Sequence, residues 1–312
     1  MQQDLFQASK KNIYIMSYIN WGNESKEQLE IRKRIEQEMI FEQMSAAAAA
    51  AAAAAGSGGI PMDPDAKAFS KITELTSTQS KYVNILVKSL KKTGIWEKLG
   101  AIYPMIGGNA TAHSYNLKDT TKFRLTFYGG WTHSANGAKP NGTNAYATTG
   151  FNPITQGFSN TNAHVAYYVM SNNAIENGRV TGISNGTDDQ PIYIIPRYTD
   201  GKAIFRFGGT VTGPTETVTN SDARGFYQLN RIDTTFYGNK NDAQIASGTQ
   251  TISAISNLDF YLGTSRVLNY GNYKYSSKEC GFASFGNSLT LEEADLYNTA
   301  VQQFQTNLER QL

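Results

Sequence analysis

The spacing of apolar residues along this chain changes from helical to extended and back to helical. In residues 25–44 apolar side chains recur at helical intervals, with Ile31, Ile35 and Met39 at i, i+4 and i+8 opposite a strongly charged face. A stripe this narrow does not stabilise an isolated helix, so we expect it to pack on its own domain, on sister chains or on a larger partner. We predict that residues 1–45 form a helical anchor in which this stripe serves docking or oligomerisation.

A tract of low complexity follows the predicted anchor. Ala46 to Ala55 are consecutive alanines, and the run Gly56-Ser57-Gly58-Gly59 comes directly after them. Polyalanine favours a helix and a Gly/Ser run ends it, which predicts a helical spacer followed by a hinge. The alternative interpretation is that the alanines stand in for side chains that were not identified. Under either interpretation residues 46–60 are a linker, and residues 61–312 form the body of the protein.

Helical spacing resumes in residues 63–102, which we predict to be a short helical collar. Asp63 suits the N-cap of a helix, and Pro64 suits its first position. The i, i+3, i+4, i+7 rule is then followed by four apolar residues: Val83, Leu86, Val87 and Leu90. Gly94 ends that helix, and three residues are expected to continue the apolar face: Trp96, Leu99 and Ile102.

Between Phe123 and Phe285 the period of the pattern becomes two, as in half-buried strands. The run "FRLTF" places its apolar residues on one side, and "LDFYLG" alternates in the same way. The run "IYIIPRYTDGKAIFRF" reads as a hairpin about an Asp200-Gly201 turn. Many short strands separated by such turns predict a β-sandwich.

The last segment returns to helical spacing. Thr290 and Glu293 match a capping box at the start of a helix. Its apolar face consists of Tyr297, Val301, Phe304 and Leu308. We expect this C-terminal helix to close over the sandwich.

Composition narrows the function classes. Charged residues make up 17% of the chain and the net charge is +2, so there is no long-range field and no basic stripe that would favour nucleic acid as a ligand. The single cysteine, Cys280, lies among strand-like apolar residues and is expected to be a buried thiol. Neither a secretory leader nor a run of about 18 apolar residues occurs, which predicts synthesis in a cytoplasm without a membrane span.

Candidate catalytic and metal-binding chemistry is sparse in the sequence. The three histidines have no metal-ligand spacing, and Asp188 and Asp189 are adjacent on a loop, where neighbouring side chains point to opposite sides. A glycosidase needs two facing carboxylates, and a calcium loop needs more ligands than these two acids. We therefore predict that the protein is not an enzyme and has no cofactor, with calcium at these aspartates only weakly indicated. The enzymatic alternative is a glycan-degrading site that depends on them.

Binding is better supported than catalysis, because flat aromatic rings beside amides and hydroxyls are suited to holding sugars. Two stretches have this character, "GGWTHSANG" and "NYGNYKYSS". The predicted ligand-binding residues are Trp131, His133, Asn136, Tyr270, Tyr273 and Tyr275. The competing interpretation is that the rings and glycines only satisfy a tightly turning β-fold.

The stretch "NGAKPNGTNAYATTGFNP" resembles the opening of concanavalin A-like, laminin-G-type modules, and "LDFYLG" with "CGFASFGNSLTLEEADLYNTAVQQFQ" is similar to their last strands and following helix. This resemblance covers about residues 115–312. It implies a mainly β fold, a concanavalin A-like (jelly-roll) β-sandwich, to which the spacing above adds a helical collar, a C-terminal helix and an N-terminal helical anchor.

A longer resemblance covers residue 61 to the end. The runs "DPDAKAF", "KSLKKTGIWEKLGAIYPMIGG", "FRLTFYGGWTHSANGAKPNGTNAYA" and "YNTAVQQFQTNLERQL" are similar to modules at the C-termini of virion proteins of tailed phages, crAss-like phages among them. The resemblance implies a fibre, decoration or adhesion component of the virion, anchored by its N-terminus and present in several copies. Its expected partners are other virion proteins, sister chains and a host-surface glycan. An active lectin is the alternative function.

Overall fold

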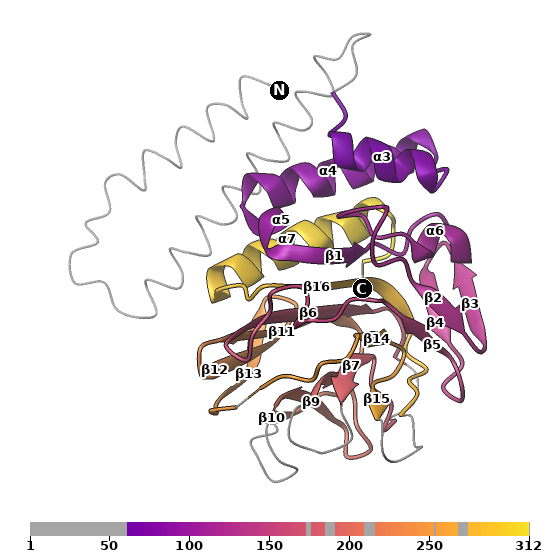
Figure 1. The fold of residues 1–312 in the computed structure, drawn as a ribbon. Helices are drawn as coiled ribbons and strands as arrows, with labels where there is room; N and C mark the ends of the chain where they lie inside the picture. Colours follow the sequence, from indigo (N-terminus) through magenta and orange to yellow (C-terminus); the bar gives the residue numbers. More distant parts are fainter. Residues whose placement is uncertain are drawn as a thin grey trace, which may run out of the picture. The chain divides into compact units, whose positions relative to one another are not determined.

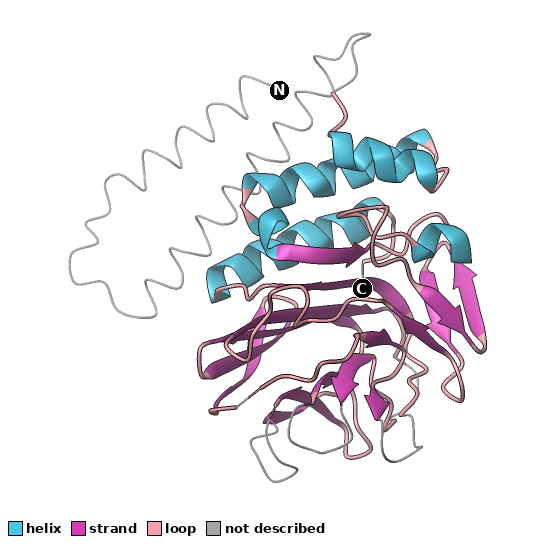
Figure 2. Ribbon diagram, in the orientation of Figure 1, coloured by secondary structure: helices cyan, strands magenta, loops and turns pink. Residues whose placement is uncertain are grey.

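Two mainly antiparallel sheets stack face to face, and helices cover the outer face of one of them (Figures 1 and 2). The computed structural model describes residues 61–172, 176–184, 191–208, 216–252, 254–267 and 274–311. All of them except Pro61 belong to one unit, Met62–Leu312. The predicted β-sandwich is confirmed.

The first sheet, here called the inner sheet, has the order β13-β12-β11-β6-β16-β4-β3, with β1 also paired to β16. Its strands are β1 (Leu99–Tyr103), β3 (Trp131–Ser134), β4 (Gly137–Pro140), β6 (Asn162–Val169), β11 (Gly225–Ile232), β12 (Thr235–Lys240), β13 (Ala243–Thr249) and β16 (Cys280–Gly286). The helices are α3 (Pro64–Ile72), α4 (Ser77–Lys92), α5 (Ile95–Lys98), α6 (Ala110–Ser114) and α7 (Leu291–Asn307).

The second sheet, here called the outer sheet, has the order β10-β9-β8-β7-β14-β5-β2, with the short β15 paired in parallel to β7. Its strands are β2 (Thr126–Tyr128), β5 (Tyr146–Thr148), β7 (Thr181–Ser184), β8 (Ile192–Ile195), β9 (Lys202–Phe207), β10 (Glu216–Thr219), β14 (Tyr261–Leu262) and β15 (Arg266–Val267). The predicted hairpin about Asp200-Gly201 is the β8–β9 pair.

The central strands of the inner sheet are buried on both faces. In β6, Val165 and Tyr167 enter the core between the sheets, while Ala166 and Tyr168 enter a second core against the helices. A strand with two buried faces reads as a nearly continuous apolar run, as "AHVAYYV" does. The inner sheet is therefore the middle layer of the body.

Helices α4 and α7 build most of the helical layer. Their buried faces are those expected from the sequence, including Val83 and Leu90 of α4 and Tyr297 and Phe304 of α7. Both helices begin with a complete capping box, at Thr76 and at Thr290. Such a box satisfies two backbone N–H groups that the first turn leaves unpaired, so the N-terminus of each helix is fixed locally.

The predicted collar ends earlier than expected. Leu99 to Tyr103 form strand β1 rather than helix, and this strand pairs with β16 of the inner sheet. Of the residues expected to continue a helical face, Trp96 does lie in a helix, α5, whereas Leu99 and Ile102 are buried in β1, where pairing satisfies the backbone groups along that side of β16. Phe123, with a φ of 56°, precedes β2, which begins only at Thr126, but Phe123, Leu125 and Phe127 all pack on the core between the sheets, as the alternation predicts.

Several predictions lie outside the described residues. They include the anchor with Ile31, Ile35 and Met39, the linker at 46–60, and the aspartates at 188 and 189. Cys280, by contrast, is one of the described residues. It is fully buried, as predicted, and burial raises the pKa of its thiol to about 12.

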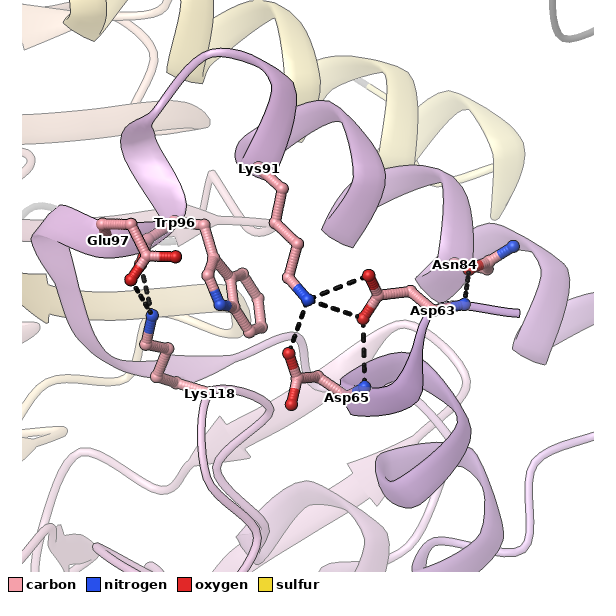
Figure 3. A network of polar contacts seen from close by, with 7 residues as sticks. All are labelled: Asp63, Asp65, Asn84, Lys91, Trp96, Glu97 and Lys118. Atoms are coloured by element: carbon pink, nitrogen blue, oxygen red, sulfur yellow. Dashed lines mark hydrogen bonds and ion pairs between the residues drawn. The ribbon is translucent and has the colours of Figure 1, made fainter. Parts of the chain in front are cut away.

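A polar network holds the start of α3 to the end of α4 (Figure 3). The Asp63 carboxylate caps α3 by accepting from the backbone N–H of Asp65 at 3.0 Å, and it also accepts from Lys91 Nζ at 2.8 Å. Lys91 donates to Asp65 as well, at 2.7 Å. Figure 3 shows the Trp96 ring between Lys91 and Lys118, whose ammonium groups lie 5.2 and 4.6 Å from its centroid.

We predict that Asp63→Ala lowers the free energy of unfolding by about 1 kcal/mol or somewhat more, because the N-cap and the Lys91 ion pair are lost together. Asp63→Asn should cost less, since asparagine caps a helix as well as aspartate does. Urea denaturation of both variants checks this. Equal losses in the two variants would mean that capping does not matter here.

A buried hydrogen-bonded chain links the inner sheet to α7. His164 Nδ1 lies 2.8 Å from Asn230 Oδ1, which also accepts from the backbone N–H of Leu289, so Nδ1 must carry the hydrogen. Nε2 therefore accepts from Ser284 Oγ at 3.2 Å, and Ser284 accepts from the Tyr297 hydroxyl at 2.8 Å. The chain satisfies the neutral imidazole, and burial lowers the pKa of His164 to about 4.

The lowered pKa of His164 makes the free energy of unfolding depend on pH, and the fold is less stable in acid. Between about pH 6.5 and about pH 4 the unfolded chain binds a proton at His164 that the folded chain does not, so acid destabilises the fold by up to ~1.4 kcal/mol per pH unit. His164→Gln cannot titrate and should reduce the slope of unfolding free energy against pH. An unchanged slope in this variant would assign the effect to other groups.

Candidate functional site

The outer sheet carries aromatic rings on the face that points away from the core. The core between the sheets takes one residue from each of three neighbouring strands: Phe127, Ala147 and Leu262. Successive side chains of a strand point to opposite faces. The residues next to them therefore lie on the outer face, and we call them the tyrosine row: Tyr128, Tyr146 and Tyr261.

The rings of the tyrosine row contact each other across strands. Tyr128 and Tyr146 are directly paired in the β2–β5 register, and their rings stack with centroids 4.9 Å apart and an interplanar angle of 15°. Tyr261 lies 5.9 Å from Tyr146, and Tyr275 lies 6.4 Å from it. Tyr146 is thus the centre of the cluster. Tyr128, on the edge strand, is 45% exposed and ends the stack.

A loop of exposed amides lies beside the exposed end of the row. Asn144 Oδ1 accepts from Asn141 Nδ2 at 2.7 Å and from the backbone N–H of Gly130 at 3.2 Å. Gly129 has a φ of 74°, and a Cβ there would lie 2.3 Å from the Asn144 carbonyl oxygen. Only glycine fits this close approach, so "GG" in the sequence has a steric cause.

Trp131 lies beneath the row and joins the two sheets. It belongs to β3, an edge strand of the inner sheet, yet its Nε1–H donates to the backbone carbonyls of Tyr128 and Tyr146 at 3.1 and 3.2 Å in the outer sheet. The indole packs against Phe127 at 5.2 Å, and a Cβ on Gly263 would lie only 3.1 Å from it. The structure therefore gives Trp131 a supporting position.

The other predicted binding residues are placed differently from one another. His133 packs its ring against both Phe127 and Trp131 and contacts His113. Asn136 is exposed in the turn between β3 and β4, where its backbone N–H donates to Ser134 Oγ. A ligand role for these residues remains a prediction.

The two aromatic stretches of the sequence meet in the fold, but through a residue that neither contains. Tyr275 reaches Tyr146, while Tyr270 and Tyr273 lie outside the described residues. Sequence analysis did not assign Tyr128, Tyr146 or Tyr261 to a binding site, because the row forms only when β2, β5 and β14 pair. The available signal was the alternation in "FRLTFY" and "DFYL", which places the tyrosines opposite core residues.

One acidic group, Glu176, meets residues from a distant segment elsewhere in the body. Glu176 accepts from the hydroxyls of Ser276 and Ser277, about a hundred positions away along the chain, and from the backbone N–H of Ser277 at 2.9 Å. Lys278 is buried beside this cluster, and its pKa is lowered by burial despite the nearby Glu176 charge. These groups hold together the segments that lead into the tyrosine row.

Among the residues whose positions the structure describes, no three His, Cys, Asp or Glu side chains lie close enough to hold a metal ion. Of the helices in the same part of the chain, none is both long and apolar enough for a membrane crossing.

No protein-family model matches this sequence, and no curated protein matches it either. Domain 4 of the extracellular arabinanase of Geobacillus stearothermophilus, solved with arabinotriose, is 15% identical, with a TM-score of 0.47, and the match covers 65% of this chain and 98% of that domain. The Trypanosoma rangeli sialidase, solved with sialic acid, is 12% identical, with a TM-score of 0.48, over 69% of this chain and 38% of the sialidase. This chain thus spans less than half of that sialidase.

A third similar structure is the CBM40 module of the Ruminococcus gnavus IT-sialidase, 16% identical over 42% of this chain and 79% of the module, with a TM-score of 0.32. At these identities and scores the neighbours carry no activity, ligand or site residue over to this chain.

The prediction that the protein is not an enzyme is nevertheless corrected by these findings. Sialidases and a domain of an arabinanase are among the solved structures similar to this chain, so its fold gives no ground for excluding a glycan-active role. The exclusion depended on the spacing of acids along the sequence. Spacing is a poor guide because folding brings distant groups together, as the contacts of Glu176 show.

We predict that Trp131→Phe lowers the free energy of unfolding by about 1 kcal/mol or more, because the ring contacts are retained while two carbonyls lose their shared donor. Chemical denaturation measures this loss. If Trp131 served only a ligand, the variant would be as stable as the natural protein.

Proposed function

We propose that this protein is a glycan-binding β-sandwich module whose binding surface is the tyrosine row. The observation that carries the proposal is the stack of Tyr128 on Tyr146, in which the terminal residue, Tyr128, is 45% exposed beside the Asn141–Asn144 amides. An aromatic face next to amide and hydroxyl groups meets both requirements of a sugar, an apolar ring face and a polar rim.

The geometry of the stack assigns different tasks to its members. Rings that stack at 15° turn their faces toward each other, so Tyr146 presents an edge and Tyr128 presents its outer face. A sugar ring would stack on Tyr128, and its hydroxyls would bond to the neighbouring amides. Trp131 would act indirectly, by holding the carbonyls of both tyrosines.

We also propose that the module is part of a phage particle. The sequence resemblance to C-terminal modules of phage virion proteins supports a component that is anchored by its N-terminal segment and displays the sandwich for attachment to a host-surface glycan. Sister chains and other virion proteins would be its partners. Detection of the chain in purified phage particles by mass spectrometry checks this setting.

We predict that Tyr128→Ala weakens glycan binding about threefold to tenfold, which corresponds to the loss of one aromatic contact. A panel of neutral and acidic oligosaccharides that includes arabinotriose and sialyllactose, measured by calorimetry, is the test. Tyr128→Phe keeps the ring face and should retain most of the affinity. Ile154→Ala removes a side chain that is also 45% exposed and serves as the matched control.

Two outcomes would count against the proposal. One is that no oligosaccharide of the panel binds the natural protein. The other is that binding occurs but Tyr128→Ala and Ile154→Ala affect it equally, which would place the site elsewhere on the body.

A further inference from the structure

Two histidines meet in an unusual contact beneath the tyrosine row. His113 of α6 and His133 of β3 approach with their Nδ1 atoms 2.9 Å apart and their ring centroids 5.1 Å apart. A contact between two imidazole nitrogens at this distance holds one hydrogen, so one ring donates and the other accepts. The ring that accepts is therefore neutral, because its Nδ1 must be bare.

The surroundings indicate which ring donates. His113 is buried, and its Nε2 has no hydrogen-bond partner among the described residues. A buried N–H without a partner is rarer in proteins than an under-used acceptor. His113 thus carries its hydrogen on Nδ1 and donates it to Nδ1 of His133, which is itself only half-buried.

The histidine pair is in direct contact with Trp131, the residue that supports the tyrosine row. The His133 ring packs edge-on to Phe127 at 4.7 Å and stacks with Trp131 at 6.2 Å. Trp131 in turn donates to the carbonyls of Tyr128 and Tyr146. A movement of His133 therefore reaches the tyrosine row through one intervening side chain.

The charged groups around the pair disfavour an added proton. The guanidinium of Arg310 is buried, donates to the carbonyls of Met105 and Ala135, and acts on His113 as a positive charge. Arg124 donates to Ser114, next to His113 on α6. Lys139 of β4 is exposed and, because it pairs with Thr132, lies on the face of the sheet opposite His133.

The pKa values agree with this geometry. Burial, the His133 charge and the Arg310 charge lower the pKa of His113 to about 3. Burial lowers the pKa of His133 below its usual 6.5. His133, which is half-buried, is thus the member of the pair that takes up a proton first.

We propose that the His113–His133 pair is a proton-operated latch that keeps Trp131 beneath the tyrosine row when both rings are neutral and releases it in acid. This regulation of the row rests on the proposed function, whereas the movement of Trp131 does not. The movement of Trp131 follows from the histidine contact itself, because the hydrogen bond between the two Nδ1 atoms needs a bare Nδ1 on one ring.

The step takes up one proton from solvent. A proton on His133 Nδ1 faces the Nδ1–H of His113, and the contact survives only if His113 moves its hydrogen to the buried, unpartnered Nε2. That rearrangement leaves a buried donor unsatisfied beside a positive ring and near Arg310, which is costly. Separation of the rings, with His133 turning toward solvent, is the cheaper result, and it removes the packing of His133 on Trp131.

The test uses the indole N–H signals of the full chain in a ¹H–¹⁵N NMR titration from about pH 7.5 to about pH 4.5. The chain has three tryptophans, and the spectrum of Trp131→Phe assigns the relevant signal. We expect the Trp131 signal to shift with a midpoint below 6.5. The Trp96 signal should stay constant, because that ring lies between Lys91 and Lys118, and it reports in the same spectrum that the body stays folded.

The matched variant is His133→Asn, which keeps a polar group near the position of Nδ1 and cannot titrate in this range. It should abolish the shift of the Trp131 signal. His113→Asn is a second variant, should the first not fold: it keeps the titratable His133 but removes the buried Nδ1–H that faces the added proton, so the Trp131 signal should titrate with a changed midpoint. A Trp131 signal that does not change with pH, or one that titrates unchanged in the variants, would refute the latch.

The regulatory step has its own readout. For an oligosaccharide of the panel that binds at neutral pH, affinity should fall by up to about tenfold per pH unit below the midpoint, and His133→Asn should remove this dependence. A flat affinity together with a titrating indole would overturn regulation and leave glycan binding standing. A titrating indole without any oligosaccharide binding would sink the proposed function and leave the latch intact.

Discussion

The structure depends on one constraint, which is that the inner sheet must be covered on both faces. Its central strands send Val165 and Tyr167 into the sandwich and Ala166 and Tyr168 toward the helices, so neither face tolerates water. Polar residues on the helical side need partners from the same layer, which is why the chain from His164 through Ser284 ends on α7. The collar and the C-terminal helix are therefore parts of the fold and not additions to it.

The same constraint determines where a binding surface can lie. Within the described part of the chain, helices cover the inner sheet, and the outward face of the outer sheet carries the tyrosine row at one edge. The row is kept in place from the other sheet, because Trp131 of β3 bonds to carbonyls of β2 and β5. A side chain that bridges two sheets is sensitive to anything packed beneath it, which gives the histidine pair its importance.

Glycan binding and regulation by protons are therefore two proposals about one small region. The first depends on an exposed ring face at Tyr128 and the second on a shared hydrogen between two imidazoles. They use different atoms, and each has a readout that does not require the other.

The sequence by itself determined what depends on neighbours along the chain: the capping box at Thr290, the Asp200-Gly201 hairpin, the buried thiol of Cys280 and the two-layer β-sandwich. Each follows from local geometry or from the period of apolar residues. Tertiary structure alone decided that Leu99–Tyr103 is a strand, because only the presence of β16 makes pairing there favourable. It also decided the tyrosine row, the position of Trp131 and the histidine pair, since their members come from segments whose contact depends on strand order, and strand order leaves no periodic signal in the sequence.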